Sequence, residues 1–211
     1  DDPRLPTLAS MQRRGFSPEA LRNFWIELAL TQKDISASMA TIYSHNIKII
    51  DETAPRLFFV KNPFPLELID GNEQIPSNFK TQIHPEDKNL GYRIWELQKE
   101  NNLIYLEKED LQLAKENNNK IRLKDFADIQ IKDNIASIIS LEPSEKLPII
   151  HWLDSKNSYD AVLEITRENE IQLIEGKLEN FPKLKLNEIT QLERIGYAKI
   201  ENKNKLIFIH N

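Results

Sequence analysis

The sequence predicts a mainly β protein with an α-helical module at its amino-terminal end. Two observations lead to this prediction. Over about the first fifty residues, apolar side chains recur with a helical period near 3.6, whereas beyond Ala54-Pro55 they alternate with a period of 2. Short apolar segments then follow one another, separated by Pro, Asn and Asp and by no long helical pattern, which favours antiparallel sandwiches or barrels.

The first predicted helix covers residues 17–30. Ser17 is a suitable N-cap, and Pro18 suits the first helical position because its missing N–H would be unsatisfied there anyway. Its buried stripe should consist of Leu21, Phe24, Trp25 and Leu28. A second helix is expected over about residues 36–52, with Met39, Ile42, Tyr43, Ile47 and Ile50 facing inward. Residues 1–50 should therefore form the helical module.

Short strands are expected through the rest of the chain. The period-2 segments are residues 56–60, 65–69, 103–106, 120–131, 136–141, 148–153, 161–165, 170–174, 191–200 and 205–210. Between them, residues 109–116 should form one or two helical turns.

Composition indicates a folded protein with a substantial core, since 40% of residues are apolar and 29% are charged. No apolar run approaches the roughly 18 residues that span a membrane, and we expect neither a signal peptide nor a membrane partner. The chain has no cysteine, which rules out disulfides and thiolate metal sites and fits a cytoplasmic location. The net charge of −5 means that any RNA contact must depend on local basic patches.

The residue pattern offers no catalytic or metal site. The glycines are too widely spaced to form a phosphate-binding loop, and the four histidines are scattered. No Gly-x-Ser-x-Gly segment is present. Adjacent carboxylates such as Glu109 and Asp110 are more typical of a solvated surface than of an acid–base pair. We therefore expect no catalytic residue, metal or cofactor in this chain, and a binding module rather than an enzyme.

Several segments occur in an order that indicates one family. The chain opens with DDPRLPTL at 1–8 and RRGFSPEALR at 13–22, followed by TQKD at 31–34. Further along are DETAPRLFFVKNP at 51–63, His84-Pro85 with Gly91, IRLKD at 121–125, IHW at 150–152 and QLERIGY at 191–197. Together they resemble the part of glutamyl- and glutaminyl-tRNA synthetases of the archaeal and eukaryotic type that follows the catalytic domain.

This resemblance implies two antiparallel β-barrels of the glutaminyl-tRNA synthetase anticodon-binding type. Residues 1–50 would be a connecting module that contacts the tRNA stem, and residues 51–211 the anticodon-binding region. Residues 51–108 and about 155–211 would form the proximal barrel, and about 109–154 the distal barrel. The class I catalytic signatures His-Ile-Gly-His and Lys-Met-Ser-Lys-Ser are absent, so the chain alone should be inactive.

The resemblance is stronger to archaeal glutamyl enzymes than to glutaminyl enzymes. The ending at 191–200 is similar to theirs, and residues 112–119 hold only Lys115 where glutaminyl relatives carry a longer basic segment. The implied parent is a glutamate--tRNA ligase that uses ATP and Mg²⁺ to attach glutamate to tRNA(Glu) for protein synthesis. We expect the chain to be a monomer that binds tRNA(Glu). Whether tRNA(Gln) is a second partner is left open by the sequence. A glutaminyl enzyme, or a non-catalytic β-rich interaction module, is the alternative.

The resemblance assigns the middle anticodon base to a small group of residues. Gln191 matches the residue that reads the middle uridine, and an amide can both donate to and accept from a base edge. Arg56 matches a contact to the same base, and Pro85 would offer a backbone contact in a rigid turn. The alternative for Gln191 is a structural role in a strand. For Arg56 it is a salt bridge at a domain junction, and for Pro85 a simple turn.

Arg122 and Lys124 match residues that grip the first anticodon nucleotide. They alternate with Ile121 and Leu123, so both cations should leave one face of a strand. Lys124 replaces a second arginine of the family, and a point charge favours holding a phosphate over reading a base.

Other cations are candidates for contacts to the tRNA backbone. These are Arg13, Arg14 and Lys33. Arg13 and Arg14 could equally be structural. The three tryptophans, Trp25, Trp95 and Trp152, are expected in the core rather than as base-stacking platforms.

Overall fold

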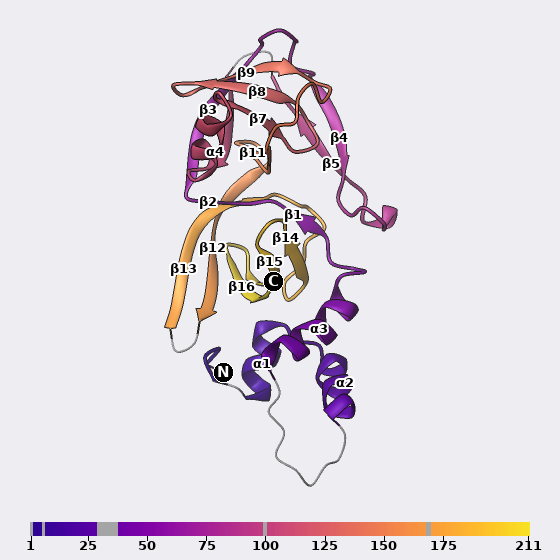
Figure 1. Cartoon of the computed structure of the whole chain (residues 1–211). Helices are drawn as coiled ribbons and strands as arrows, with labels where there is room; N and C mark the ends of the chain where they lie inside the picture. Colours follow the sequence, from indigo (N-terminus) through magenta and orange to yellow (C-terminus); the bar gives the residue numbers. More distant parts are fainter. Residues whose placement is uncertain (1, 6, 29–37, 99–100, 168–169) are drawn as a thin grey trace.

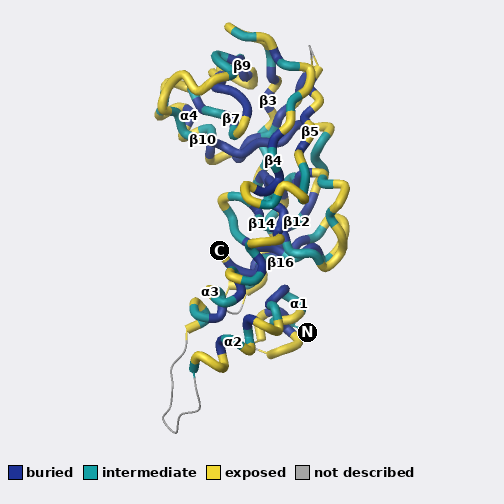
Figure 2. The backbone as a smooth tube through the Cα atoms, turned by 90° about the vertical axis from the view of Figure 1, so that its right-hand side faces the viewer, coloured by how far each residue is buried: buried dark blue, intermediate teal, exposed yellow. Residues whose placement is uncertain are grey.

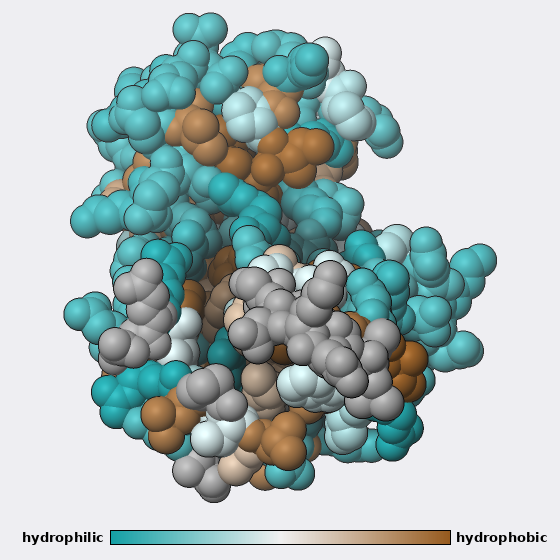
Figure 3. Space-filling view, turned by 60° about the horizontal axis from the view of Figure 1, so that its bottom comes forward, coloured by the Kyte–Doolittle hydropathy of each residue, from teal (hydrophilic) through white to brown (hydrophobic). Residues whose placement is uncertain are grey.

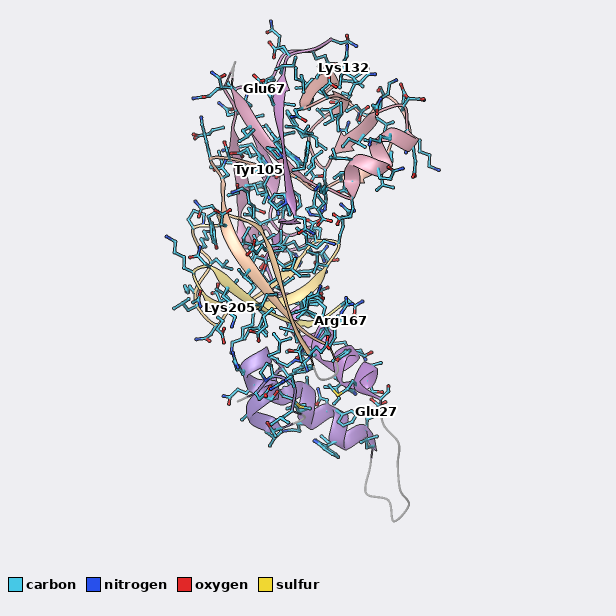
Figure 4. All side chains as sticks on the ribbon, turned by 90° about the vertical axis from the view of Figure 1, so that its left-hand side faces the viewer. Glu27, Glu67, Tyr105, Lys132, Arg167 and Lys205 are labelled. Atoms are coloured by element: carbon cyan, nitrogen blue, oxygen red, sulfur yellow. The ribbon has the colours of Figure 1, made fainter. Side chains whose placement is uncertain are left out.

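The computed structural model describes residues 2–5, 7–28, 38–98, 101–167 and 170–211. These residues form stacked bodies with their own cores: helices at one end, one sheet in the middle and a second sheet at the other end (Figure 1). Figure 4 labels Glu27 in the helical end, Lys205 and Arg167 in the middle body, and Tyr105, Glu67 and Lys132 in the far body. Within the described ranges, no helix has the length and apolar character that crossing a membrane requires.

The helical module contains α1 (Leu8–Arg14), α2 (Pro18–Leu28) and α3 (Met39–Ile50). The predicted N-cap of α2 is confirmed, because Ser17 Oγ accepts a hydrogen bond from the Glu19 N–H at 3.2 Å. Helix α1 lies in a segment for which the sequence predicted no helix. It ends at Gly15, whose φ of 106° suits glycine because it has no Cβ. The predicted ends at residues 29–30 and 36–37 lie outside the described residues.

The inward stripes of α2 and α3 are largely as predicted, with one exception. Phe24, Ile42 and Ile50 are buried, but Trp25 is 65% exposed. The prediction that Trp25 belongs to the core is therefore wrong. Successive helical residues point about 100° apart, and α2 buries only the face that carries Phe24. Trp95 and Trp152 are buried as predicted.

Sheet A occupies the middle of the molecule. Its strands, in hydrogen-bonded order, are β1 (Arg56–Leu57), β14 (Ile189–Leu192), β15 (Gly196–Asn202), β16 (Lys205–His210), β12 (Ser158–Arg167), β13 (Glu170–Glu179) and β2 (Phe59–Lys61). The β1–β14 and β12–β16 pairs are parallel, and the other pairs are antiparallel.

Sheet B forms the far body. Its order is β10 (Ile149–Ile150), β7 (Lys120–Leu123), β8 (Asp128–Lys132), β9 (Ile135–Ser140), β3 (Pro63–Ile69), β6 (Asn102–Glu107) and β11 (Leu153–Asp154). Two of its pairs, β10–β7 and β3–β9, are parallel. A separate hairpin, sheet C, consists of β4 (Asn78–Gln82) and β5 (Tyr92–Glu96). Helix α4 (Asp110–Glu116) and a short 3₁₀ helix, η1 (Lys88–Leu90), complete the described elements.

The predicted mainly β fold with an amino-terminal helical module is confirmed, and sheets A and B are each barrel-like. The finer prediction of two antiparallel barrels needs correction, because within the described residues sheets A and B are both mixed and the hydrogen-bonded order of each ends in two edges. The reason lies in how the edges are made. In sheet A, the edge strands β1 and β2 are two parts of one segment that is interrupted at Phe58. In sheet B, β10 and β11 are likewise separated only by His151 and Trp152. Each segment bends and pairs at both ends of its sheet, so the sheet curls without a continuous ladder between its edges.

The sheets draw on separate parts of the chain. Sheet A uses residues 56–61 and 158–210, and sheet B uses 63–69, 102–107 and 120–154. The strands within residues 63–107, which the sequence reading grouped with the proximal barrel, thus pair in sheet B and sheet C. The domain boundaries themselves stay a prediction.

The segment that connects the two bodies contributes to both of their cores. Leu57 and Phe59 pack in the core of sheet A, whereas Phe58 and Val60 pack in the core shared by sheets B and C. An uninterrupted apolar run is what a strand buried on both faces requires. Figure 2 shows the buried residues inside the sheets and where the bodies meet, with exposed residues at the outer loops.

Candidate nucleic-acid interface

A cavity of about 380 Å³ lies where sheet A, sheet C and the β7–β8 turn meet. It contains three of the residues singled out from the sequence, namely Arg56, Pro85 and Lys124. Its other lining residues are Thr81, Gln82, Ile83, Asp125 and Glu193. Two cations and two carboxylates therefore face one small space. A larger open cavity of about 910 Å³ lies over α4 and β8, and none of the predicted site residues lines it.

Two hairpin turns place charged side chains at the smaller cavity. The strand expected over 120–131 is divided by a turn in which Asp125 has a φ of 57°. The strand expected over 191–200 is divided by a turn in which Arg194 has a φ of 66°. The two turns meet through an ion pair between Lys124 Nζ and Glu193 Oε2. The Trp152 indole N–H donates to the Lys124 carbonyl at 3.1 Å and so supports the first turn from the core.

Arg56 enters the cavity from β1 and is held by several neighbours. Its Nη2 lies 3.5 Å from Asp51 Oδ1, a carboxylate that also accepts a hydrogen bond from the Tyr197 hydroxyl. Burial, and then this hydrogen bond, raise the pKa of Tyr197. The Arg56 Nε is buried and has no hydrogen-bond partner among the described residues. One donor of the guanidinium is therefore unused.

Gln191 is the register partner of Arg56 in the parallel β1–β14 pair. Partners in register and residues two apart on a strand lie on the same face of a sheet. Gln191 thus shares a face with Arg56, while the neighbouring Thr190 and Leu192 are buried. Gln191 does not line the cavity itself.

Pro85 lies in the β4–β5 loop, which His84 anchors. Two backbone N–H groups, of Glu86 and Asp87, approach His84 Nδ1 at 3.2 and 2.9 Å. Nδ1 must therefore accept, so the proton is on Nε2, which donates to the Asp51 carbonyl at 3.1 Å. The loop is tied to the end of the helical module, and Pro85 occupies a defined place at the cavity.

Arg122 does not line the cavity, although it lies on the strand that leads to Lys124. Its Nη1 lies 2.6 Å from Asp128 Oδ1, and its Nη2 donates to the Leu141 carbonyl at 3.1 Å. Burial favours the neutral form of Asp128, but Ser144 and Arg122 outweigh burial and keep the Asp128 pKa below its ordinary value. Ile121 and Leu123 are buried, as the alternation predicts.

Two of the predicted backbone contacts, Arg13 and Arg14, lie on α1 in the helical module and do not line this cavity. The Arg13 guanidinium contacts Glu201 at 2.9 Å. Arg14 Nη2 donates to the Ile209 carbonyl at 2.9 Å, and its guanidinium lies over the Phe16 ring. Both side chains attach α1 to sheet A. Lys33 lies outside the described residues.

Five lining residues were not predicted from the sequence, for two reasons. Thr81 and Gln82 lie on β4 and Ile83 directly follows it; this strand was not predicted, although the turn residues between 84 and 91 are typical of a hairpin. Asp125 and Glu193 lie in turns that were expected to be strand. Asp is depleted in strands and tolerates positive φ, so Lys124-Asp125 carried a signal for a turn. No cluster of three or more metal-binding side chains occurs within the part of the chain that the structure describes.

Comparison with known proteins identifies the relatives of this chain. Residues 54–143 match the model of the anticodon-binding domain of class I tRNA synthetases (E and Q). The chain is 36% identical over 208 residues to a glutamate--tRNA ligase of Methanosarcina barkeri, covering 95% of this chain and 34% of the relative. A glutamate--tRNA ligase of Pyrococcus furiosus is 33% identical over 221 residues, covering 100% of this chain and 37% of the relative. The chain thus spans about a third of the length of the curated relatives it matches.

Proposed function

We propose, on the premise that this chain belongs to the anticodon-binding family of the class I tRNA synthetases for glutamate and glutamine, that the 380 Å³ cavity receives the middle anticodon base of tRNA(Glu). One observation carries the proposal. Residues from β1, the β4–β5 loop and the β7–β8 turn, far apart in the sequence, converge on this one space.

The lining side chains suit the edge of a uracil. That edge presents two carbonyl acceptors with an N–H donor between them, so its complement is an acceptor flanked by donors. Arg56 and the Thr81 hydroxyl are donors, and the Glu193 carboxylate is an acceptor. Glu193 is paired with Lys124 in the free protein. A bound nucleotide would exchange that ion pair for contacts of its own.

Gln191 is proposed to read the base from the rim of the cavity. Its place beside Arg56 in the register supports this role. Pro85 would close the opposite side through its backbone. Thr81 adds a hydroxyl group, whose oxygen accepts from the Trp95 indole N–H at 3.0 Å, so its own proton remains able to donate.

The remaining cations are proposed to hold the RNA backbone. Lys124 would bind a phosphate next to the cavity. Arg122 would share this task for the first anticodon nucleotide, but it would have to give up contacts with Asp128 and Leu141. Arg13, Arg14 and Lys33 are proposed to contact phosphates of the tRNA stem. In the free protein Arg13 is paired with Glu201 and Arg14 is bonded to the Ile209 carbonyl, and RNA binding would either add to these contacts or replace them.

We infer that the chain is the RNA-recognition part of a longer, cytoplasmic glutamate--tRNA ligase. In that protein the catalytic part would activate glutamate with ATP and Mg²⁺ and transfer it to tRNA(Glu). The chain alone is proposed to be inactive, so glutamate-dependent ATP–pyrophosphate exchange by the purified chain would contradict this part of the proposal. Because the matched family includes glutamine enzymes, tRNA(Gln) is tested beside tRNA(Glu).

The experiment is a double-mutant cycle between Gln191 and the middle anticodon base. Binding of tRNA(Glu) and of a transcript with cytidine at that base is measured for the unmodified chain and for Gln191→Ala. We expect Gln191→Ala to cost about 1–3 kcal/mol with tRNA(Glu) and little with the altered transcript, because the lost contact is to one base.

Gln172→Ala is the matched control, an exposed strand glutamine of sheet A beyond the part of β13 that pairs with β2. It should not distinguish the two transcripts. Simple addition of the two losses would reassign Gln191 as a structural residue. Absence of binding to either tRNA would favour the interaction-module alternative.

A further inference from the structure

Arg93 is a buried cation that joins two walls of the cavity without lining it. The residue lies in β5 and is 6% exposed. Its Nη1 donates to the Gln82 carbonyl at 3.1 Å, and its Nη2 donates to the Arg56 carbonyl. Gln82 and Arg56 both line the cavity, whereas Arg93 does not. One guanidinium group therefore spans from the backbone of β4 to the backbone of β1.

Glu179 holds Arg93 in this position. Arg93 Nε lies 2.7 Å from Glu179 Oε1, and Glu179 Oε2 accepts the Phe58 N–H at 3.0 Å. The guanidinium carbon is 4.3 Å from the centroid of the Phe58 ring. Phe58 is the residue at which the chain bends between β1 and β2, so the Arg93–Glu179 pair also fixes this bend.

The pair is costly to bury, which indicates that its geometry matters. The Arg93 and Glu179 side chains are 4% and 6% exposed. Burial raises the pKa of Glu179 against the opposing effect of Arg93. Well-packed apolar residues often replace a buried ion pair without loss of stability, so a pair of this kind is a poor stabiliser. A guanidinium is planar and holds its donors in a rigid fork, so it fixes the relative position of the groups it binds.

We propose that Arg93, held by Glu179, is a positioning residue that sets the discrimination of the cavity between anticodon bases. The inference rests on the proposed function of the cavity. Arg93 keeps Arg56 and Gln82 at the separation that one base edge requires. Without that link, β4 and β1 can shift relative to each other, and a mismatched base is accommodated more easily.

The test compares two conservative variants with a matched control. Arg93→Lys keeps the charge but loses the fork, and Glu179→Gln keeps the size and an acceptor oxygen but loses the charge. The control is Glu164→Gln on β12, the strand next to β13. The Glu164 side chain is also 6% exposed and pairs with a cation, Lys205, at 2.8 Å. Unlike Arg93, however, Lys205 is not linked, among the described residues, to one that lines the cavity. Urea unfolding is measured for all three variants.

The readout is the ratio of affinities for tRNA(Glu) and for the transcript with cytidine at the middle anticodon base. A partly unfolded sample lowers both affinities equally, so the ratio reports the folded cavity alone. We expect Arg93→Lys and Glu179→Gln to reduce the ratio by about tenfold, the order of one base-edge contact. Glu164→Gln should leave it unchanged even though it loses a comparable ion pair.

The possible outcomes separate this inference from the proposed function. No base preference in the unmodified chain would reject the proposed function. A clear preference there that Arg93→Lys and Glu179→Gln both retain would reject the positioning role alone. An equal reduction in Glu164→Gln would also reject it, because the effect would then follow from any lost ion pair in sheet A.

Discussion

Sheet A makes two junctions, one with the helical module and one with sheets B and C, and the two are built from different side chains. The helical junction is a cluster of aromatic and aliphatic groups that includes Phe16, Phe24, Tyr197 and Ile209. The junction between the sheets contains buried charged pairs. The helical module is thus attached mainly by apolar burial, with a partly exposed ion pair between Arg13 and Glu201 beside it. Sheets B and C are attached through charged pairs that are buried.

His210 is the polar centre of the helical junction. Its ring stacks on Tyr43 with the centroids 5.0 Å apart, and its Nε2 lies 2.9 Å from the Asn46 side-chain amide nitrogen. Asn46 Oδ1 in turn accepts the Ser17 N–H at 2.9 Å. Burial lowers the pKa of His210 to about 4, and nearby Arg14 acts in the same direction. The ring is therefore neutral in the folded protein near pH 7.

The junction between the sheets keeps its charges. Arg194 Nη1 and Nη2 lie 2.9 and 2.8 Å from the two oxygens of the buried Asp110 carboxylate, and Nη1 lies 3.1 Å from His151 Nδ1. Burial alone would raise the pKa of Glu107, but His151, with Lys61 and Arg194, holds it below its ordinary value. Directional pairs fix orientation more tightly than apolar contact does, and the cavity lies at this junction.

The largest change in the free energy of unfolding should come from removing one partner of a buried charged pair at the junction between the sheets. Arg93→Met leaves the Glu179 carboxylate buried without its counter-charge, which should lower the free energy of unfolding by about 3–5 kcal/mol. Arg93→Met with Glu179→Leu should recover part of that loss, because no uncompensated charge remains. Urea unfolding of both proteins is the measurement. Equal stability of the single and double variants would mean that charge does not govern this junction.

A smaller change in stability should come from the helical junction, where the free energy of unfolding should depend on pH through His210. An unfolded histidine has a pKa near 6.5, whereas the pKa of His210 in the folded protein is about 4. Between these values the unfolded chain binds a proton that the folded chain does not. Stability should therefore fall as the pH is lowered from 6.5 to 4, by up to about 3 kcal/mol.

His210→Gln removes the titrating ring and should flatten this part of the pH dependence. The measurement is urea unfolding of both proteins at a series of pH values from 7 to 4.5. Carboxylates with lowered pKa values, such as Glu107, contribute to the slope in both proteins, so the difference between them reports His210. Identical slopes would contradict the buried, neutral state of the ring.

The smallest effect is expected on the outer face of the helical module. Trp25 and Ile26 are exposed on α2, and apolar side chains at this end of the molecule gather in separate groups among polar ones (Figure 3). Trp25→Ser should change the free energy of unfolding by no more than about 0.5 kcal/mol. The adjacent Phe24→Ala should cost about 3 kcal/mol because Phe24 is buried. Equal losses would show that Trp25 is covered by the protein in solution.

The local periods of the sequence determined most of the elements, and resemblance to a family singled out several of the candidate site residues. The change of period at Ala54-Pro55 separated helices from strands. The strand expected over residues 56–60 is present as β1 and β2, interrupted at Phe58. Family resemblance identified Arg56, Pro85 and Lys124, which converge on one cavity. The elements depend on neighbours in the sequence, so a reading of short windows can find them, whereas the candidate residues came from segments spread along the chain.

Tertiary structure alone decided how these pieces meet. In β5, Arg93 and Trp95 face inward while Tyr92 and Ile94 are exposed, a pattern opposite to what hydrophobicity predicts for Arg93 and Ile94. Arg93 can be buried because Glu179 supplies its counter-charge and the Gln82 and Arg56 carbonyls accept its hydrogen bonds. These partners come from three other strands. Likewise, Lys124 and Glu193 meet although 69 residues separate them. The stability of a buried charge depends on partners that folding brings from distant parts of the chain, and no local pattern specifies them.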